Sequence, residues 1–528
     1  MLLLKKLGED GFRQRLLDDL QQQNLQPRLL NPDELWHAVK DRAVDMFTSA
    51  MVTFIGRCRQ RAWFADDLVQ HATWRKAYHD VDDYEIEFYR IGHEVYKRYM
   101  DRLGSDNLED FNGVMLRAAE TVKEGNTRFE RKGNAGDIRD IHYLHIDEYQ
   151  DFSRSFYDLT SAMREMNPDM NVFTVGDDWQ AINNFAGADL AYFRNFEDHF
   201  ADAQRLSATR NYRSRRAIVS ASNALLNPED EPAKAANEGE GNVHICDLAG
   251  FTPTKIELQS MHPDKPTADA DRTAGYHIAV TRIAQRLAKE GDVAFLNRTR
   301  DPDVLIGANP QTAQRALRDL LAAELRERVA VDTAHSYKGL ERDSVVILDA
   351  VANHYPLIHP HWIFGQIFGD TLESLEAAEL RLFYVAVSRA KKRLIICTQN
   401  AKRSPFLAKV QASCGFPSLD PNSLPPIESV DSRRYEVRVF QSFHVKDLLK
   451  NDGFAFDDPE DGGDRHWYKV LPREAVTKNW IDKAPWNDGT ARVEVYDETG
   501  TCVWPSVGDA VNAATDTTGP AIVNDIPF

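Results

Sequence analysis

The chain contains 528 residues, of which 42% are hydrophobic and 28% are charged, and its formal net charge is −18. These values are typical of a soluble globular protein with roughly two to four domains. The acidic balance does not indicate a wholly basic nucleic-acid-binding protein. A local groove of Arg, Lys and aromatic side chains could still bind a strand within an acidic chain.

The five cysteines are scattered, with no Cys-x-x-Cys pair. This usage indicates a reducing compartment and argues against a disulfide framework or a structural zinc site. The apolar run in Met1–Lys6 is too short for a signal peptide, and no stretch approaches membrane-spanning length. We therefore expect a cytoplasmic protein.

The first part of the chain, residues 1–135, is predicted to be mostly helical, because long runs mix apolar and charged residues and contain few glycines. Apolar residues recur there at helical spacing, which predicts a side that faces a core. The residues on this predicted face are Phe88, Ile91, Val95, Tyr96 and Tyr99.

Two short apolar runs, at 141–146 and 171–175, each end in carboxylates. The first run leads to Asp147 and Glu148, and the second leads to Gly176–Gln180. Buried-type strands with acids at their ends predict a parallel sheet with chemistry at its carboxyl edge. One carboxylate could hold a hydrated Mg²⁺ while the next orients a water molecule. The alternative is two solvated acidic turns, but it does not explain the glutamine that follows the second turn.

The middle of the chain predicts further alternation of helices and strands. Helices are expected at about 215–226, 270–289 and 376–390, and strands at 293–296, 329–332, 344–348 and 393–397. Asn211–Ser214 precedes the first of these helices, and Thr333–Glu341 lies between two of the strands. Taken singly, Arg213, His335 and Arg389 could be ordinary surface or structural residues.

The last part of the chain changes in character after a proline-rich linker at 413–432. Residues 433–512 are predicted to form a small β-rich domain, and 513–528 a disordered tail. The tryptophans of this region are Trp467, Trp480, Trp486 and Trp504. These aromatic residues are interleaved with lysines, so they could stack on bases or form the core of the small domain.

In chain order, these segments resemble motifs II to VI of superfamily 1 UvrD/Rep-type DNA helicases. Asp147–Asp151 (Asp-Glu-Tyr-Gln-Asp) is similar to the Walker B motif, motif II. The stretch Gly176–Ile182, running on to Phe185–Asp189, is similar to motif III. Asn211–Ser214, Thr333–Glu341 and Glu379–Ala390 resemble motifs IV, V and VI. The Asp-Asp-Trp-Gln of motif III resembles the helicase IV branch more than UvrD itself.

The family's glycine-rich P-loop, Walker A, is not found. No Gly-Lys-Ser or Gly-Lys-Thr occurs in the sequence, although such a loop cradles nucleotide phosphates in this family. We therefore expect a P-loop-containing partner protein or a missing N-terminal segment to supply it, or ATPase chemistry to have been lost.

The resemblance implies an α/β fold with two RecA-like parallel-sheet motor domains, the first incomplete at its N-terminus, a helical insertion and a small C-terminal β-rich domain. Residues 1–135 would be the insertion region and 136–205 the remainder of the first motor domain. Residues 206–412 would form the second motor domain, with a reduced insertion at about 228–290.

The resemblance also implies the role of each matched residue, with ATP and Mg²⁺ as cofactors. Asp147 would hold Mg²⁺ with Glu148 beside it, and Glu148 would activate the attacking water. Gln180 would sense the terminal phosphate, Arg213 and Arg389 would reach it, and Gly339 and Glu341 would approach the ribose. The implied DNA-binding residues are Phe185, Asn183, Thr333, His335 and Lys338. Asn183 departs from the tyrosine usual at its position.

Two functions follow from these expectations. The first is an ATP-dependent 3′-to-5′ helicase or translocase that acts on single-stranded DNA or a 3′-tailed duplex. The second is a non-hydrolysing module that binds single-stranded DNA or a protein. Five matched catalytic residues favour the motor, and the absent P-loop favours the binding module.

Overall fold

The computed structural model describes residues 32–504, except 184–186, 201–202, 262–271, 302, 400–402, 429–433, 459–463 and 498–499. For residues 32–43 it describes the backbone alone. Three expectations therefore lie outside the described residues: the start of the helical region, the position of Phe185, and the tail at 513–528.

The chain folds into two compact units, each made of two separate segments. The first unit comprises Met1–Ala208 and Pro356–Val385, and the second comprises Thr209–Tyr355 and Ala386–Phe528. Residues 356–385 therefore do not belong with the rest of the expected second motor domain at 206–412, which corrects that boundary.

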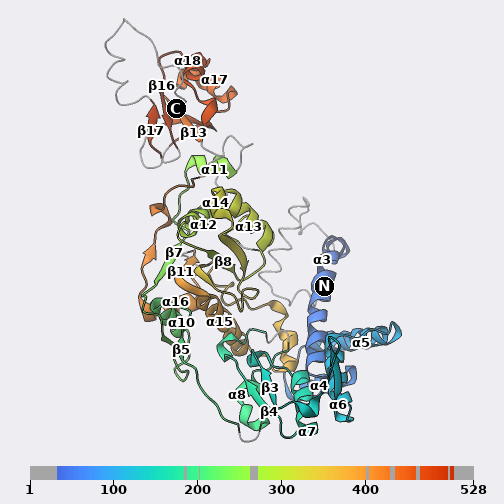
Figure 1. The fold of residues 1–528 in the computed structure, drawn as a ribbon. Helices are drawn as coiled ribbons and strands as arrows, with labels where there is room; N and C mark the ends of the chain where they lie inside the picture. The colour runs from blue at the N-terminus through green and yellow to red at the C-terminus, as the bar shows by residue number, and fades with distance from the viewer. Residues whose placement is uncertain are drawn as a thin grey trace. The chain divides into compact units, whose positions relative to one another are not determined.

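Helices dominate the start of the first unit, as predicted (Figure 1). They are α3 (Pro32–Gln60), α4 (Ala65–Tyr78), α5 (Asp83–Ser105) and α6 (Phe111–Lys123). Side chains cap two of them, because Asp82 accepts a hydrogen bond from the Tyr84 amide and Asp110 accepts one from the Gly113 amide. Phe88 and Tyr96 are fully buried on α5, whereas Val95 is 37% exposed, so the predicted apolar face is narrower than expected.

The segment that returns to the first unit does so through aromatic packing. The 3-10 helix η6 (Pro360–Phe368) places the ring of Phe364 on that of Phe88, with 3.7 Å between centroids. Arg57 also forms an ion pair with Asp370, with 2.6 Å between Nη1 and Oδ2. These contacts bury aromatic area between segments roughly 300 residues apart in the chain, which no local pattern could predict.

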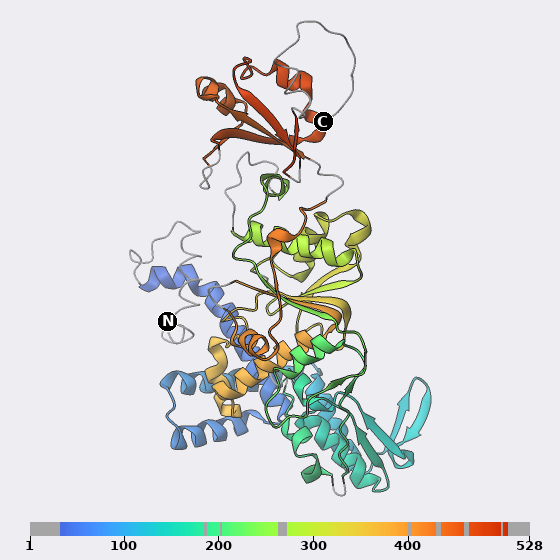
Figure 2. The same cartoon turned by 90° about the vertical axis from the view of Figure 1, so that its left-hand side faces the viewer.

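After the helices come the hairpin β1 (Arg128–Arg131) and β2 (Asn134–Asp137), which projects from the unit in Figure 2. The two expected acidic strands then form as β3 (Tyr143–Ile146) and β4 (Asn171–Thr174). They pair in parallel and are joined by α7 (Arg154–Met166). Two short helices, α8 (Ala191–Arg194) and α9 (Phe196–His199), follow.

Strands β3 and β4 differ from the buried type that the sequence predicts. One face packs on a small aromatic core through Ile146 and Val172. The other face exposes Tyr143 by 65% and Phe173 by 54%, and Val175 beyond it by 51%. The reason is that, within the described residues, only these two strands form the sheet and nothing covers its second face.

The second unit is built on a parallel sheet in which the described strands follow the order β12-β7-β11-β10-β8-β9. Their bounds are β7 (Asn242–Asp247), β8 (Val293–Asn297), β9 (Val329–Thr333), β10 (Arg342–Ile347), β11 (Ala390–Thr398) and β12 (Ser418–Leu419). Four of them match the strands expected from the sequence, because each reads as a short run of β-branched and apolar residues between turns.

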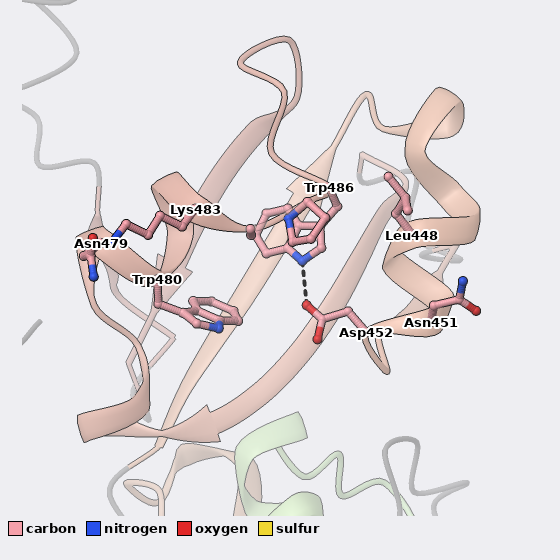
Figure 3. A pocket seen from close by; sticks show the side chains of 9 residues that line it. Leu448, Asn451, Asp452, Asn479, Trp480, Lys483 and Trp486 are labelled. Atoms are coloured by element: carbon pink, nitrogen blue, oxygen red, sulfur yellow. Dashed lines mark hydrogen bonds between the residues drawn. The ribbon is translucent and has the colours of Figure 1, made fainter.

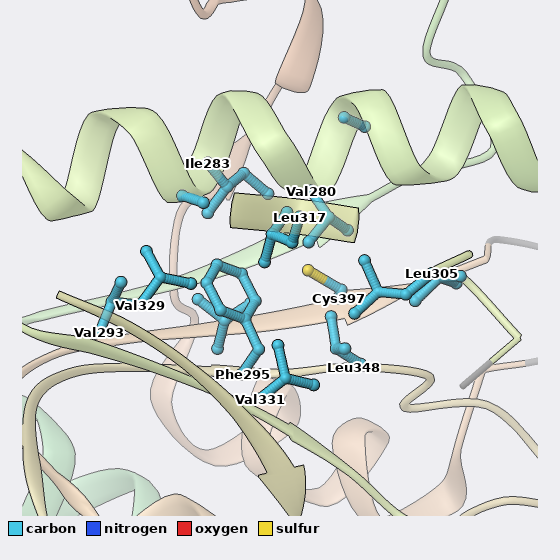
Figure 4. Packing of buried hydrophobic residues seen from close by; sticks show 14 of the residues in the cluster. Val280, Ile283, Val293, Phe295, Leu305, Leu317, Val329, Val331, Leu348 and Cys397 are labelled. Atoms are coloured by element: carbon cyan, nitrogen blue, oxygen red, sulfur yellow. The ribbon is translucent and has the colours of Figure 1, made fainter. Parts of the chain in front are cut away.

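One face of this sheet is covered by α12 (Arg272–Ala288) and α13 (Pro310–Asp319). Figure 4 shows Val280 and Ile283 from α12 and Leu317 from α13 packing over sheet residues such as Phe295. The remaining helices of this part are α10 (Arg216–Asn223), α11 (Lys255–Met261), α14 (Ala323–Arg326) and α16 (Pro405–Cys414). Helix α15 (Leu372–Ser388) belongs to the first unit up to Val385, and its last residues belong to the second. The short strands β5 (Arg210–Asn211) and β6 (Lys234–Ala235) pair in parallel beside α10.

Two expectations about this unit need correction. The span 228–290 was expected to be a reduced insertion, but it contains β7 and α12, which are part of the sheet and its cover. The proline-rich segment at 413–432 was expected to be a linker, yet it contributes the edge strand β12. It also packs on α12, where the Arg282 guanidinium donates to the Leu424 carbonyl at 3.0 Å.

The C-terminal part forms an antiparallel sheet with the order β14-β15-β13-β16-β17. Its strands are β13 (Arg434–Phe440), β14 (Ala455–Asp457), β15 (His466–Pro472), β16 (Arg492–Tyr496) and β17 (Cys502–Trp504). Helices α17 (Lys446–Asn451) and α18 (Lys478–Lys483) pack beside it. Trp467 and Trp486 lie in its core, which supports the structural interpretation for these two tryptophans.

Candidate active site

The acidic pair that follows β3 lies at the carboxyl end of that strand, as the sequence predicts. Asp147 and Glu148 are both exposed, and the Glu148 amide donates to Asp147 Oδ1 at 2.9 Å. Glu148 adopts a left-handed backbone conformation, with φ 52° and ψ 41°. Residues other than glycine rarely adopt this conformation, and its strain is characteristic of positions that the surrounding structure holds in place. The chain therefore turns sharply at the proposed general base.

Gln150 connects the two acidic strand ends. Its side chain is buried, and its Oε1 accepts a hydrogen bond from the Asp177 amide at 3.0 Å, while its Nε2 donates to the Glu148 carboxylate. Gly176 makes room for this bridge, because a Cβ there would lie 2.6 Å from Gln150 Oε1. The sequence placed Gln150 inside motif II but gave it no role, since only the pairing of β3 with β4 brings it to Asp177.

The loop after β4 positions Gln180. Asp177 Oδ1 accepts from the Trp179 amide at 3.0 Å, and Asp177 Oδ2 accepts from Gln180 Nε2 at 2.8 Å. The ring of Trp179 lies 5.3 Å from that of Tyr384, and the buried Arg381 donates from Nε to the Ala181 carbonyl at 3.0 Å. Residues of α15 thus support the loop of Gln180 from inside the first unit, a role that the sequence did not assign to Arg381.

Asn183, which is expected to contact DNA, also contacts the acidic loop. Its Nδ2 donates to Asp151 Oδ2 at 2.9 Å. Asn183 therefore lies against motif II and shares the first unit with Asp147, Glu148 and Gln180.

In the second unit, Glu341 lies between two cations. Its Oε2 is 2.7 Å from Arg213 Nε, and its Oε1 is 2.6 Å from Lys391 Nζ. A hydrogen bond from Lys391 and, to a lesser extent, the charge of Arg213 lower the pKa of the Glu341 carboxyl. All three side chains are roughly one-third exposed, so a polyanionic ligand could compete for the two cations. Lys391 was not among the residues expected at the site, although it directly follows motif VI.

The loop that carries Arg213 is held by its own turn and by the start of β11. Asn211 Oδ1 accepts from the amides of Arg213 and Ser214, at 3.0 and 2.8 Å. Ser214 Oγ donates to the Ala390 carbonyl at 2.7 Å. A hydrogen bond therefore joins motif IV directly to Ala390, the last residue of motif VI.

Arg389 directly follows the end of α15 at Ser388 and is 1% exposed. Its Nη2 donates to Ser388 Oγ at 2.9 Å, and its Nη1 approaches the Leu340 carbonyl at 3.5 Å. Gly339, just before that carbonyl, has φ +81°, a conformation that favours glycine. The turn of motif V thus lies against the arginine of motif VI, and both belong to the second unit.

Motif V forms a compact turn after β9. The Thr333 hydroxyl donates to Ser336 Oγ at 2.9 Å, and the Tyr337 amide donates to the Thr333 carbonyl at 3.1 Å. Burial, together with the positive charge of Arg298, lowers the pKa of His335 to about 4, so its imidazole is neutral near pH 7. Lys338 is half-buried in the same turn.

The donor set at the end of β3 fits a magnesium ion. Mg²⁺ uses one or two carboxylates together with water and phosphate oxygens, rather than a cage of protein ligands. Asp147 and Glu148 supply exposed carboxylate oxygens, and among the described residues no group of three or more His, Cys, Asp or Glu side chains could hold a metal. When bound there, the ion would act as a Lewis acid on phosphate oxygens.

Comparison with known proteins gives the family. Residues 5–201 match the model of the UvrD/REP helicase N-terminal domain, and residues 311–401 match that of the UvrD-like helicase C-terminal domain. Among the described residues, no helix is both long and apolar enough to cross a membrane.

Three relatives illustrate the likeness. DNA helicase IV of Escherichia coli is 23% identical over 410 residues, which cover 76% of this chain and 52% of the relative. A Mycoplasma pneumoniae protein named "Probable DNA helicase" is 25% identical over 341 residues, with 63% and 58% covered. The ATP-dependent DNA helicase PcrA of Bacillus subtilis is 28% identical over 162 residues, with 30% and 21% covered.

The chain thus spans a little over half the length of the first two relatives. A solved structure, the C-terminal domain of a possible DNA helicase from a Lactobacillus, is similar over 40% of this chain and 99% of its own, with 18% identity and a TM-score of 0.22, which carries no argument about the fold. On the two matched domain models and the order of its motifs, the chain belongs to the UvrD/Rep family of DNA helicases.

Proposed function

We propose that the protein is an ATP-dependent 3′-to-5′ translocase or helicase that acts on single-stranded DNA or a 3′-tailed duplex. The observation that carries this proposal is the bridge through Gln150, which ties the carboxylate of Glu148 to the loop of Gln180. A catalytic base and a phosphate sensor need a fixed relative geometry, whereas two solvated acidic turns do not.

The residues of the first unit take the roles that the family motifs imply. Asp147 holds Mg²⁺, and Glu148 accepts a proton from the attacking water. Gln180, held on Asp177, senses the terminal phosphate. The exposure of both carboxylates supports this assignment, because their oxygens are accessible to ligands.

The residues of the second unit supply positive charge to the phosphates. Arg213 exchanges Glu341 for a phosphate oxygen, and Arg389 stabilises charge that grows in the transition state. Gly339 and Glu341 approach the ribose. The ion pair of Glu341 with Lys391 supports this scheme, because Lys391 keeps the carboxylate charge compensated after Arg213 leaves.

The proposed DNA contacts lie in motif V and in motif III. Thr333, His335 and Lys338 contact the strand from motif V, and Phe185 and Asn183 contact it from motif III. Because its pKa is lowered to about 4, His335 contributes a neutral hydrogen-bonding ring rather than a charge.

A P-loop-bearing α/β segment from a partner chain or from an N-terminal segment completes the first unit in this proposal. The exposed face of β3 and β4 supports it, because parallel sheets are normally covered on both faces and two strands are marginal alone. The rings of Tyr143, His145 and Phe173 lie side by side on this exposed face. The ring centroids of Tyr143 and His145 are 6.3 Å apart, and those of His145 and Phe173 are 5.6 Å apart.

Steady-state ATP hydrolysis tests the proposal. The chain is assayed with oligo(dT), alone and with a P-loop protein encoded beside it, and we expect DNA-stimulated hydrolysis in at least one mixture. Glu148→Gln should abolish that hydrolysis and leave DNA binding intact, whereas Glu130→Gln, an exposed glutamate of β1 in the same unit, should change neither. Persistent hydrolysis in Glu148→Gln would show that another residue is the base.

A second candidate is a non-hydrolysing module that binds single-stranded DNA or a protein. The absence of Gly-Lys-Ser and Gly-Lys-Thr from the sequence favours it. The absence of DNA-stimulated hydrolysis from both mixtures, together with intact oligo(dT) binding, would select this candidate. Strand displacement on duplexes with 3′ or 5′ tails separately tests the direction of movement.

A further inference from the structure

The small C-terminal sheet carries a pocket of about 580 Å³ that the motor mechanism does not use. It lies between α17 and α18 (Figure 3). It is lined by Leu448, Asn451, Asp452, Asn479, Trp480, Lys483, Ala484, Pro485 and Trp486. Its volume falls in the usual range for small-molecule sites.

Hydrogen bonds hold Trp486 and Asp452 in the lining of the pocket, and a lysine neutralises the Asp452 charge. The buried Trp486 donates from Nε1 to Asp452 Oδ2 at 2.6 Å, and Lys469 donates to Asp452 Oδ1 at 3.0 Å. The single carboxylate in the lining is therefore already paired with a cation of the same domain. It orients the indole and leaves little net negative charge to repel an anion.

One side of the pocket is formed by the indole ring of Trp480, which is partly exposed to solvent. The ring of half-buried Trp480 lies 5.7 Å from that of Trp486, at 68° to it. Its backbone is held at the start of α18, where Thr477 Oγ1 accepts from the Trp480 amide at 3.1 Å. Figure 3 shows Trp480 and Leu448 on opposite sides of Trp486.

The rim carries polar groups that the fold does not use. Asn451, Asn479 and Lys483 are exposed. In the part of the chain that the structure describes, no hydrogen bond or ion pair engages their side chains. The pocket thus offers two amides, each a donor and an acceptor, and one uncompensated ammonium group. Asp447 and Asp482 lie on the same helices but do not line it.

We propose that this pocket binds one nucleotide unit of single-stranded DNA. The base stacks on Trp480, the amides of Asn451 and Asn479 contact its edge, and the phosphate pairs with Lys483. A flat ring with a polar edge and an attached anion matches an aromatic plate beside amides and a lysine. The site takes its DNA substrate from the proposed function, but it does not depend on ATP hydrolysis.

The test uses the full chain and an oligo(dT) that contains 5-iododeoxyuridine. Photocrosslinking followed by peptide mapping should place a crosslink in residues 478–486. Trp480→Ala should weaken oligo(dT) affinity roughly tenfold, and Trp480→Phe should restore most of it. Lys483→Gln should lower the dependence of log affinity on log salt by about one. Lys478→Gln, an exposed lysine of α18 outside the lining, is the matched control and should leave affinity and slope unchanged.

The outcomes distinguish this site from the motor. A crosslink at Trp480 in a chain without ATPase activity would support the pocket and overturn the motor. DNA-stimulated hydrolysis with no crosslink at 478–486, and unchanged affinity in Trp480→Ala and Lys483→Gln, would overturn the pocket alone. If added thymidine monophosphate abolished the crosslink while the oligonucleotide stayed bound, the pocket would bind a free nucleotide rather than a DNA strand, which would contradict the proposal. Binding of a peptide there, with no effect of any variant on DNA, would also contradict it.

Discussion

Arg213 and Glu341 form an ion pair with 2.7 Å between Nε and Oε2, and it joins motif IV to motif V inside one unit. The two residues are far apart in the chain, and each was expected to contact nucleotide rather than the other. In the proposed function, a phosphate competes with this carboxylate for the guanidinium. This competition gives the first prediction.

Glu341→Gln removes the charge that holds Arg213 and Lys391. Because the pair is about one-third exposed, we expect the free energy of unfolding to change by less than about 1 kcal/mol. Loss of the ribose contact should raise KM for ATP several-fold with a smaller change in kcat. Thermal unfolding and steady-state kinetics measure the two effects. Glu240→Gln, which removes a more exposed pair with Arg216, is the control. A several-fold fall in kcat with an unchanged KM for ATP would contradict the assigned ribose contact.

Gln150→Ala should uncouple the two acidic strand ends. The substitution leaves the half-buried Asp177 amide without the Gln150 side chain as acceptor, so we expect a loss of about 0.5–1.5 kcal/mol in the free energy of unfolding. Any ATPase activity should fall at least tenfold, because Glu148 and Gln180 lose their common support. Chemical denaturation and hydrolysis assays report these changes. Gln70→Ala, on the exposed side of α4, should alter neither.

Because His335 is neutral near pH 7, we expect its contribution to DNA affinity not to change with pH around neutrality. Burial places its folded-state pKa at about 4, below the value of about 6.5 in an unfolded chain. Protonation of this ring therefore opposes folding. The pH dependence that it causes is confined to the interval between these values, where stability rises with pH. The affinity ratio of wild type to His335→Gln for oligo(dT) should stay constant from about pH 6.5 to 8. A severalfold change of that ratio in this range would show a charged ring at the interface.

Asp349 predicts the opposite slope. Burial and the nearby charge of Asp303 raise its pKa to about 7, above its ordinary value of 3.8. Between these values the folded chain holds a proton that the unfolded chain does not, so stability falls as pH rises, by up to roughly 1.4 kcal/mol per pH unit. Asp349→Asn should remove this slope, whereas the exposed Asp319→Asn should retain it. Unfolding curves at several pH values measure it, and equal slopes in both variants would exclude Asp349 as the source.

The sequence by itself determined the family, the order of the motifs, and which strands lead to Asp147 and to the motif V loop at Thr333. These features depend on residue type and local period, so neighbouring residues are enough to reveal them. Helix α12 and strands β8 to β11 fall close to where the pattern predicts, because an amphipathic helix and short apolar runs are read from a window of a few turns.

Tertiary structure decided the rest. Gln150 reaches Asp177 only because β3 and β4 pair in register. Residues 356–385 join the first unit through contacts with residues far away in the chain, such as Phe364 with Phe88 and Asp370 with Arg57. The same holds for the two tryptophans that share a small domain, Trp486 in its core and Trp480 at a pocket. The physical reason is that burial and strand pairing depend on residues that are distant in the chain. A local sequence pattern does not show which distant residue a side chain will contact.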